Sequence, residues 1–581
     1  GGKSEQGSAW YWAGGTALGG FFAAVAYHDH VRRRIERTSM LRRINEQAIA
    51  RLRRDWRGLP ETPVAVPPEH QAVATDLDLF GHASLFHYLC SAGTPIGIRV
   101  LRDWFLEPAS PEEIQQRQQA VAELAPKLDL RQTLTLESRL LADRGRASER
   151  FVEWAEGEPW LAARPRLGWL FRIMSAAVLL TVVLIGCGVL PFELGASIVF
   201  GLLFANAFFT ALVGAKAHAI FRRVSLRQGE VARYLRIFEL MLSMPATSRY
   251  LNDLQREVTS VGGGALRRLR QLHRIAVLAM MHRSALLAVF VYLPLQLLFL
   301  YDVHVLTLLE AWQSRYGRHA RGWFLALGKF EALASLATLS HDEPAWATPD
   351  VRPSAAAVEA RALGHPLLPG ERRVGNDVEV GPAGVFLLVT GSNMSGKSTL
   401  LRAIGVNAVL AQAGAPVCAE RLAMPPAVLA TSMRIRDSLE DGVSFYMAEL
   451  MRLKEIVDLA RDPPSRGGRV LLYLLDEILL GTNSRERHLA VVRVLEHLLQ
   501  CGAIGAISTH DLELATSEPL AGVCRCVHFC ETLHGDGAER PMTFDYKLRS
   551  GVATTTNALK LLEIVGLDRP SRQTAIRRPE E

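Results

Sequence analysis

Residues 391–398 have the composition and spacing of a phosphate-binding loop. They read Gly-Ser-Asn-Met-Ser-Gly-Lys-Ser and satisfy the pattern GxxxxGK[ST]. In such a loop the glycines let backbone N–H groups curl around phosphates, the lysine reaches the β- and γ-phosphates, and the last hydroxyl ligates Mg²⁺. Chance could produce the bare pattern, but an apolar run typical of a buried strand precedes it at 385–390 and a helical pattern follows it. We therefore predict that ATP and Mg²⁺ bind through Gly391, Asn393, Met394, Gly396, Lys397, Ser398 and Thr399.

Three side chains elsewhere could complete a site that hydrolyses ATP. The apolar run 470–475 ends in Asp476 and Glu477, and the carboxyl end of a parallel strand lies beside such a loop. We expect Asp476 to hold Mg²⁺ through water and Glu477 to polarise the attacking water. A strand over 503–509 ends at His510, which is well placed to sense the γ-phosphate, although a lone histidine is usually structural. The pattern predicts a P-loop ATP hydrolase.

A second group of reactive side chains favours a strand over a metal site. The group consists of Cys524, Cys526, His528, Cys530 and His534. Its C-x-C-x₃-C spacing is not the pair of CxxC turns that usually binds zinc. Alternation of residue types instead predicts a strand in which the cysteines are small buried side chains.

Length and composition limit the class of protein. The chain has 581 residues, 49% of them hydrophobic, and a mean hydropathy of +0.11, which is high for a wholly soluble protein. These values allow two to four domains and exclude global disorder. Seven cysteines, an odd number in so long a chain, favour a reducing compartment. Because the first residue is Gly rather than Met, we expect a processed or trimmed chain.

The net charge of +7 is concentrated near the start of the chain. Residues 28–57 contain ten arginines and four acidic residues, a balance of +6. An uncharged stretch, 6–27, precedes them, so positive-inside flanking of a membrane helix explains the charge better than nucleic-acid binding does. A signal peptide is the alternative, but its basic end should come first. We predict a transmembrane helix at 6–27 and a basic juxtamembrane helix at 28–66.

Residues 168–215 have the strongest membrane signal. Two uncharged runs, 173–192 and 194–215, are separated only by Glu193 and have arginine or lysine at both outer ends. Each is close to the roughly 20 residues that a spanning helix needs. We predict a transmembrane helical hairpin, with a core hairpin of a soluble domain as the alternative. A shorter run, 284–301, contains Pro294 and is expected to be a core helix rather than a membrane segment.

Several motifs together resemble the MutS family of ATPases. The phosphate loop has the Asn-Met pair of MutS, and the segments at 364–366, 376–377, 476–484, 508–510 and 543–548 also resemble that family's ATPase domain. Residues 78–108 and 330–336 resemble, more faintly, the start and the return of the MutS lever domain. The resemblance covers roughly 355–570 with high specificity.

The resemblance implies a multidomain architecture and a composite site. Helical core segments at 70–165 and 216–342 would flank the hairpin, and an α/β, ABC-like ATPase domain would occupy 355–570. Two ATPase domains would sandwich the nucleotides in a homodimer. Ser444 would act on the partner's γ-phosphate from a helix N-terminus, or would only cap that helix.

The chain also departs from the family pattern. It has Leu479-Leu480 where MutS normally has Gly-Arg. We expect it to lack room for the mismatch-reading and connector domains, and we expect the hydrophobic hairpin to stand in place of the clamp that closes MutS around DNA.

Three functions are consistent with these features. The first is a membrane-tethered, DNA-binding ATPase of repair or recombination, with mismatched DNA as the substrate class of the family. The second is a mechanochemical membrane ATPase that no longer binds DNA and acts on a membrane partner. An exporter is the least favoured, because the sequence shows few membrane helices and no intramembrane ionisable pair. We expect the chain in a bacterial inner membrane, with the helical core and the ATPase domain in the cytoplasm.

Overall fold

The structure, a computed structural model, divides the chain into two compact units. It describes residues 2–142, 147–224, 230–281, 288–392, 394–434, 445–479, 483–533 and 542–553. Unit 1 comprises Gly1–Ala50, Ser91–Val100 and Lys127–Ala334, and unit 2 comprises Arg51–Cys90, Leu101–Pro126 and Ser335–Glu581. Four residues singled out in the sequence, Asn393, Ser444, Leu480 and His534, lie outside the described residues.

Unit 1 is helical throughout its described residues. Its helices are α1 (Gly2–Arg53), α6 (Leu128–Ala142), α7 (Ala147–Glu156), α8 (Pro165–Gly186), α9 (Phe192–Val224), α10 (Glu230–Ser243), α11 (Arg249–Ser260), α12 (Ala265–Ala279), α14 (Leu293–Phe299) and α15 (Tyr301–Asp342). Helices α1 and α15 each end a few residues inside the stretch assigned to unit 2.

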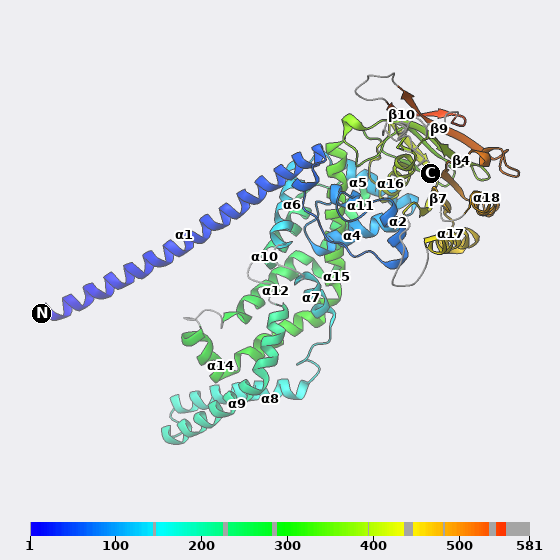
Figure 1. Ribbon diagram of the computed structural model, residues 1–581. Helices are drawn as coiled ribbons and strands as arrows, with labels where there is room; N and C mark the ends of the chain where they lie inside the picture. The colour runs from blue at the N-terminus through cyan, green and yellow to red at the C-terminus, as the bar shows by residue number, and fades with distance from the viewer. Residues whose placement is uncertain are drawn as a thin grey trace, which may run out of the picture. The chain divides into compact units, whose positions relative to one another are not determined.

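Helix α1 is one continuous helix, which corrects the predicted boundaries (Figure 1). The sequence predicted one helix at 6–27 and another ending at residue 66. Alanine and arginine both favour helix, so nothing interrupts it near residue 27. It ends at Arg53 because Arg54 adopts a left-handed conformation, with φ of 55°. The 6–27 stretch is less apolar than α8 and α9, since its glycines lower its mean hydropathy, and its crossing of a membrane stays a prediction.

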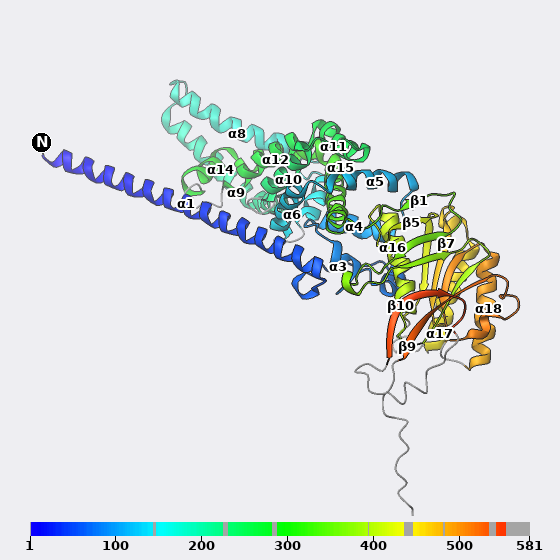
Figure 2. The same ribbon diagram turned by 90° about the horizontal axis from the view of Figure 1, so that it is seen from above.

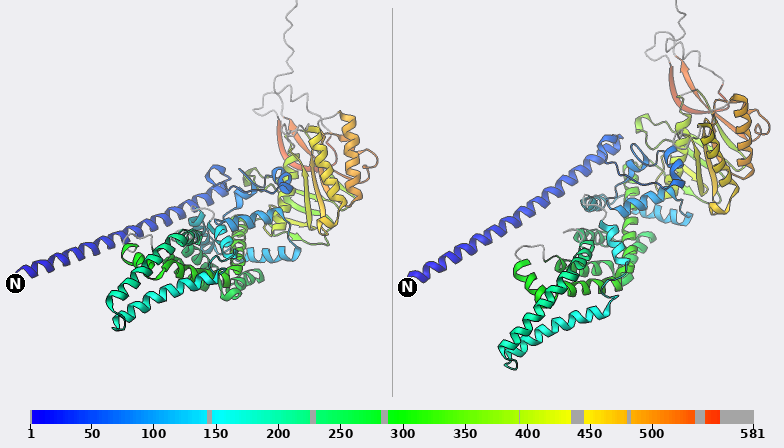
Figure 3. Two further views of the ribbon diagram at one scale, coloured as in Figure 1. Left: turned by 90° about the horizontal axis from the view of Figure 1, so that it is seen from below. Right: turned by 60° about the horizontal axis from the view of Figure 1, so that its bottom comes forward.

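The two helices of the hairpin predicted at 168–215 are present as α8 and α9 (Figure 3), while their crossing of a membrane stays a prediction. Within the described part of the chain, these are the two single helices long and apolar enough to cross a membrane. Helix α9 continues beyond the predicted end, to Val224. Large apolar side chains on both helices are exposed: Leu179, Leu180, Val183, Phe200, Phe204 and Phe208.

The expectation of a core helix at 284–301 is wrong for its described residues. A π-helical turn, Ala288–Tyr292, leads into α14, which packs against α8 and α9. Phe290 is 74% exposed, so the segment shares the apolar exterior of the hairpin. Leu300 is left-handed, and the chain bends there by 82° into α15. Asn206 of α9 donates to the carbonyl oxygens at the end of α14, which the bend leaves without helical partners.

The same bend buries an ionisable pair that the sequence analysis did not find. Asp302 is 2% exposed, and its Oδ2 lies 3.0 Å from Nε2 of His218 on α9. The hydroxyl of Tyr292 donates to the same oxygen at 2.8 Å. Both residues lie just beyond the uncharged runs 194–215 and 284–301, and they come from segments far apart in the sequence.

Unit 2 contains short helices and two sheets. Its early helices are α2 (Gln71–Asp76), α3 (Leu85–Leu89) and α5 (Pro111–Leu124), while α4 (Pro95–Leu106) is shared with unit 1. A four-stranded sheet has the order β1 (Asp350–Val351), β5 (Arg421–Met424), β2 (Val358–Leu363), β3 (Asn376–Val380). A six-stranded sheet has the order β10 (Met542–Ser550), β9 (Cys524–Leu533), β4 (Phe386–Thr390), β8 (Ile504–Ser508), β7 (Val470–Asp476), β6 (Ala427–Ser432).

Helices cover both faces of the six-stranded sheet (Figure 2). All its strands are parallel except β10, which pairs antiparallel with β9. Tyr473 and Leu475 of β7 join the core beneath α17 (Phe445–Arg461) and α18 (Ser484–Gln500). Leu474 faces the other way, against α16 (Lys397–Ala413). The strand predicted around Cys524 is confirmed as β9, whereas His534 lies outside the described residues.

Candidate active site

The predicted phosphate loop connects β4 to α16. All five residues of β4 are buried, and α16 begins at Lys397. Gly391 has a φ of 141°, and a Cβ there would lie 2.9 Å from Oγ of Ser395. Gly396 has a φ of 109° and caps α16. These two positions therefore require glycine, and they leave the N–H groups at the start of α16 available to an anion.

Lys397 is folded back onto this loop. Its side chain is 4% exposed, and Nζ donates to the carbonyl oxygens of Gly391 at 3.0 Å and Ser392 at 3.1 Å. Burial lowers the pKa of the ammonium group, and the nearby carboxylate of Glu477 opposes that shift. The Lys397 ammonium group thus already lies against the loop, where phosphate oxygens would bind.

Glu477 and His510 meet beside Lys397, as their positions at strand ends predicted. Oε1 of Glu477 lies 2.9 Å from Nε2 of His510 and 3.5 Å from Nζ of Lys397. Glu477 has a left-handed φ of 47°, and its N–H donates to the carbonyl oxygen of Ser508 on β8. The hydrogen bond from His510 is the main cause that lowers the pKa of Glu477, with Lys397 adding to it. Glu477 is therefore an ionised acceptor at neutral pH.

Asp476 is the last residue of β7 and accepts a hydrogen bond from the hydroxyl of Ser508. Ser398 and Thr399 line the cavity at the start of α16. Ser395 Oγ is buried and has no hydrogen-bond partner among the described residues. This set of carboxylate and hydroxyl oxygens suits Mg²⁺, which prefers hard oxygen ligands.

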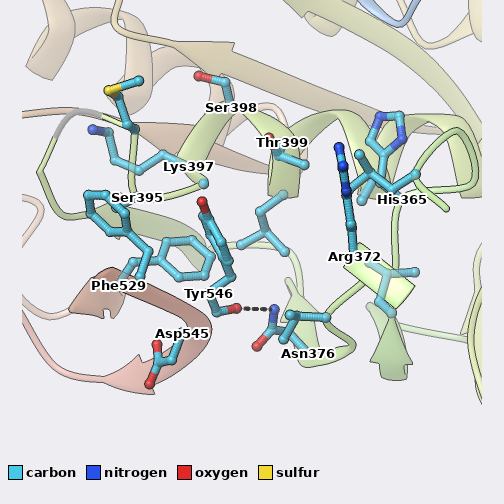
Figure 4. A pocket seen from close by; sticks show the side chains of 18 of the residues that line it. His365, Arg372, Asn376, Ser395, Lys397, Ser398, Thr399, Phe529, Asp545 and Tyr546 are labelled. Atoms are coloured by element: carbon cyan, nitrogen blue, oxygen red, sulfur yellow. Dashed lines mark hydrogen bonds between the residues drawn. The ribbon is translucent and has the colours of Figure 1, made fainter. Parts of the chain in front are cut away.

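A cavity of about 700 Å³ extends from the phosphate loop, a volume typical of small-molecule sites (Figure 4). The sequence analysis assigned no site role to five of the side chains that line it: His365, Arg372, Asn376, Phe529 and Tyr546. Segments containing three of them were noted only as family-like. In Figure 4, Lys397 and Ser395 lie on one side of Tyr546, and His365 and Arg372 lie on the other.

A bulge in β10 brings Tyr546 to this position. The register between β9 and β10 shifts between Phe544 and Leu548, and Tyr546 is left-handed, with φ of 54°. Asn376 holds the bulge, because its amide nitrogen donates to the carbonyl oxygen of Tyr546 and its amide oxygen accepts from the N–H of Leu548. The cavity therefore has a polar, cationic end at the loop and an aromatic wall beside it.

His365 supplies a neutral ring to the far side of the cavity. Burial is the main cause that lowers its pKa to about 4, and the charge of Arg402 contributes. The imidazole is consequently uncharged at neutral pH and can contact a flat, uncharged group.

The remaining predicted positions are less informative. Met394 lines the cavity but is 83% exposed. Leu479 is fully buried, and its N–H donates to the carboxylate of Glu449, so its side chain packs in the core of the ATPase half.

His488 binds two side chains of the segment that follows His510. Nδ1 of His488 on α18 lies 2.7 Å from Oδ2 of Asp511, and its Nε2 lies 2.9 Å from the hydroxyl of Ser517. Glu513 lies close enough to complete a group of three potential metal ligands. Because both ring nitrogens of His488 already have protein partners, we interpret the group as structural.

Comparison with known families identifies the chain. A model of MutS domain III matches residues 72–167, and a model of MutS domain V matches residues 387–577. The second match contains the phosphate loop, Asp476, Glu477 and His510. The chain belongs to the MutS family.

Curated MutS relatives match over limited stretches. The DNA mismatch repair protein MSH6 of Arabidopsis thaliana is 31% identical over 238 residues, 39% of this chain and 17% of that protein. The DNA mismatch repair protein MutS of Natronomonas pharaonis is 34% identical over 182 residues, 31% of this chain and 20% of that protein. Endonuclease MutS2 of Thermomicrobium roseum is 35% identical over 168 residues, 28% of this chain and 20% of that protein. The chain thus matches about a fifth of the length of these MutS-family proteins.

Proposed function

We propose that this MutS-family chain binds ATP in the cavity at the phosphate loop and hydrolyses it. The observation that carries the proposal is the convergence of Lys397, Glu477 and His510 at the loop end of that cavity. A cation, an ionised carboxylate and a histidine come from three separate elements, and no packing requirement of the sheet explains their meeting. Charged groups gathered in a cleft are typical of catalytic sites.

The loop would bind the phosphates. The N–H groups at the start of α16 would donate to phosphate oxygens, and Lys397 would exchange its two carbonyl acceptors for the β- and γ-phosphates. Tyr546 and the neutral His365 would contact the base along the wall of the cavity. Ser398 and Asp476 would hold Mg²⁺, which supplies neutralisation of phosphate charge when bound.

Glu477 would then orient and polarise a water molecule for attack on the γ-phosphorus. A bond forms between the water oxygen and phosphorus, and the bond to the bridging oxygen of ADP breaks. Glu477 accepts the water proton, which passes on to the released phosphate. His510 would hold the carboxylate of Glu477 in place through the 2.9 Å contact. It would also contact the γ-phosphate while negative charge develops on the leaving oxygen of ADP.

We further propose that ATP joins two ATPase domains in a homodimer, with Ser444 acting across the interface as the family resemblance implies. Hydrolysis would release the domains and move the helical levers. The composite ATPase site of the MutS family supports this pairing of two chains.

The test compares two variants of the detergent-solubilised full chain. Glu477→Gln should lower kcat by about 10²- to 10⁴-fold, because it removes the proton acceptor, and should retain ATP binding and accumulate the ATP-bound dimer. Lys397→Ala should lose nucleotide binding itself. Steady-state hydrolysis and equilibrium binding of a fluorescent ATP analogue measure both effects. Normal turnover by Glu477→Gln would show that another group is the base.

The exposed apolar side chains of α8, α9 and α14 support a second element of the proposal, an anchor in a bacterial inner membrane. The helical core and ATPase parts would then be cytoplasmic. With this anchor, the output of the lever movement is either DNA gripping in repair or recombination, or work on a membrane partner without DNA.

DNA binding by Glu477→Gln, with and without ATP and across a salt series, separates these outputs. We expect an ATP-dependent affinity that falls steeply with salt if basic side chains contact DNA phosphates. ATP-driven dimerisation without any DNA binding would instead favour the membrane partner and remove the repair role.

A further inference from the structure

Asp76, at the end of α2, binds the end of strand β6. The side chain is 3% exposed. Its Oδ2 accepts from the hydroxyl of Thr431 at 2.7 Å and the N–H of Met433 at 3.1 Å, and its Oδ1 accepts from the N–H of Arg434 at 2.9 Å. One buried carboxylate therefore binds three of the four residues 431–434, at the point where β6 ends. In the sequence, these residues directly precede the segment 435–444, which ends in Ser444.

The residues beside Asp76 also contact the helix that begins at the phosphate loop. Leu77 is fully buried against Gly405 of α16, where a Cβ would lie 2.5 Å from a Leu77 methyl carbon. Arg402 of the same helix donates through Nε to the carbonyl oxygen of Asp76 at 3.2 Å. The absence of a side chain at residue 405 is thus what allows this close approach.

An ion pair completes the link. The guanidinium of Arg434 binds both carboxylate oxygens of Asp78, with Nη2 at 2.9 Å from Oδ2. Asp78 has a left-handed φ of 51°. Both side chains are more than a third exposed, so their pairing contributes little to folding stability.

These contacts join two parts of the MutS architecture. Residues 76–78 lie in the stretch that matches domain III, whereas Arg402 and Arg434 lie in the stretch that matches domain V. Resting on the ATPase function proposed above, we propose that Asp76 and Asp78 are positioning residues that fix the start of the Ser444 segment relative to the phosphate-loop helix. A displacement of residues 76–78 would then change whether one ATPase domain can complete its partner's site.

The Asp78–Arg434 pair offers the sharpest test, because the buried Asp76 is also needed for packing. Asp78→Asn removes the charge and tolerates the left-handed backbone, which asparagine adopts readily. Arg434→Gln removes the opposite charge, and Arg434→Lys retains it. An exposed pair on α17, Lys454 and Asp458, supplies the matched control through Lys454→Gln and Asp458→Asn.

In the full detergent-solubilised chain, Asp78→Asn and Arg434→Gln should each lower kcat and the extent of ATP-dependent dimerisation, roughly three- to thirty-fold. KM for ATP should stay unchanged, because neither side chain lines the nucleotide cavity. The double variant should be no worse than the poorer single variant, and Arg434→Lys should recover part of the loss. Thermal unfolding midpoints should match those of the control variants.

The inference would be overturned by kcat and dimerisation equal to wild type in both single variants, or by losses that simply add in the double variant. A rise in KM without a fall in kcat would also overturn it, since the pair would then act on nucleotide binding. Failure of the wild-type chain to hydrolyse ATP would instead count against the proposed function, so the two failures are distinguishable.

Discussion

The phosphate-loop region and the hairpin of α8 and α9 follow opposite rules of burial. Around the loop, apolar strands are buried and the charged side chains of Lys397 and Glu477 gather at the strand ends. In the hairpin, Phe200 and Phe204 are each 74% exposed while Asn206 is fully buried. A polar interior beneath an apolar exterior is stable where the surroundings are lipid.

The contrast teaches how to interpret buried polar groups in this chain. At the phosphate loop the buried Lys397 faces the carboxylate of Glu477 in the cavity, whereas other buried polar groups of unit 2, such as Asn407, bind backbone groups. In the hairpin the buried amide of Asn206 likewise binds backbone groups, the carbonyl oxygens at the end of α14. A buried polar group in this chain is therefore a candidate for chemistry only where it also faces the cavity.

The largest expected effect comes from reversing the exterior of the hairpin. Phe200→Arg with Phe204→Arg should remove the chain from the membrane fraction or prevent its accumulation, since each arginine costs about 2.5–3.5 kcal/mol at the centre of a spanning helix. Quantifying the chain in membrane and soluble fractions after an alkaline wash measures the effect.

A matched pair on α17 makes this comparison specific. Met447 and Met451 have the same i, i+4 spacing and are 49% and 53% exposed. Met447→Arg with Met451→Arg should leave the membrane fraction unchanged. If the hairpin variant instead accumulates in the membrane fraction at the wild-type level, these side chains do not face lipid and the contrast fails.

Much of the ATPase half could be predicted because its signals are local. The apolar run before Gly391, the glycines of the loop and the helical pattern after Ser398 each specify one element. The general geometry of parallel sheets then brings Glu477 and His510 to the loop, and they do meet there. The hairpin was equally predictable, since composition and length decide it.

What could not be predicted depends on contacts between distant segments. Tyr546 lines the cavity only because a bulge held by Asn376 turns its backbone. Asp302 is buried because the bend after Leu300 brings it to His218. Helix α1 extends across the predicted boundary because charge does not end a helix, whereas a left-handed residue such as Arg54 does.

The smallest expected effect is a change in pH dependence at the loop. Because the hydrogen bond from His510 lowers the pKa of Glu477, the carboxylate stays ionised as pH falls through the ordinary glutamate range. His510→Ala removes the main cause of that shift, so the acid limb of kcat/KM should move to higher pH. His510→Gln, whose amide can still donate, should move the limb less. His497→Ala, on an exposed part of α18, should leave it in place. An acid limb at the same pH in wild type and His510→Ala would mean that His510 does not lower the pKa of Glu477 and that Lys397 alone does so.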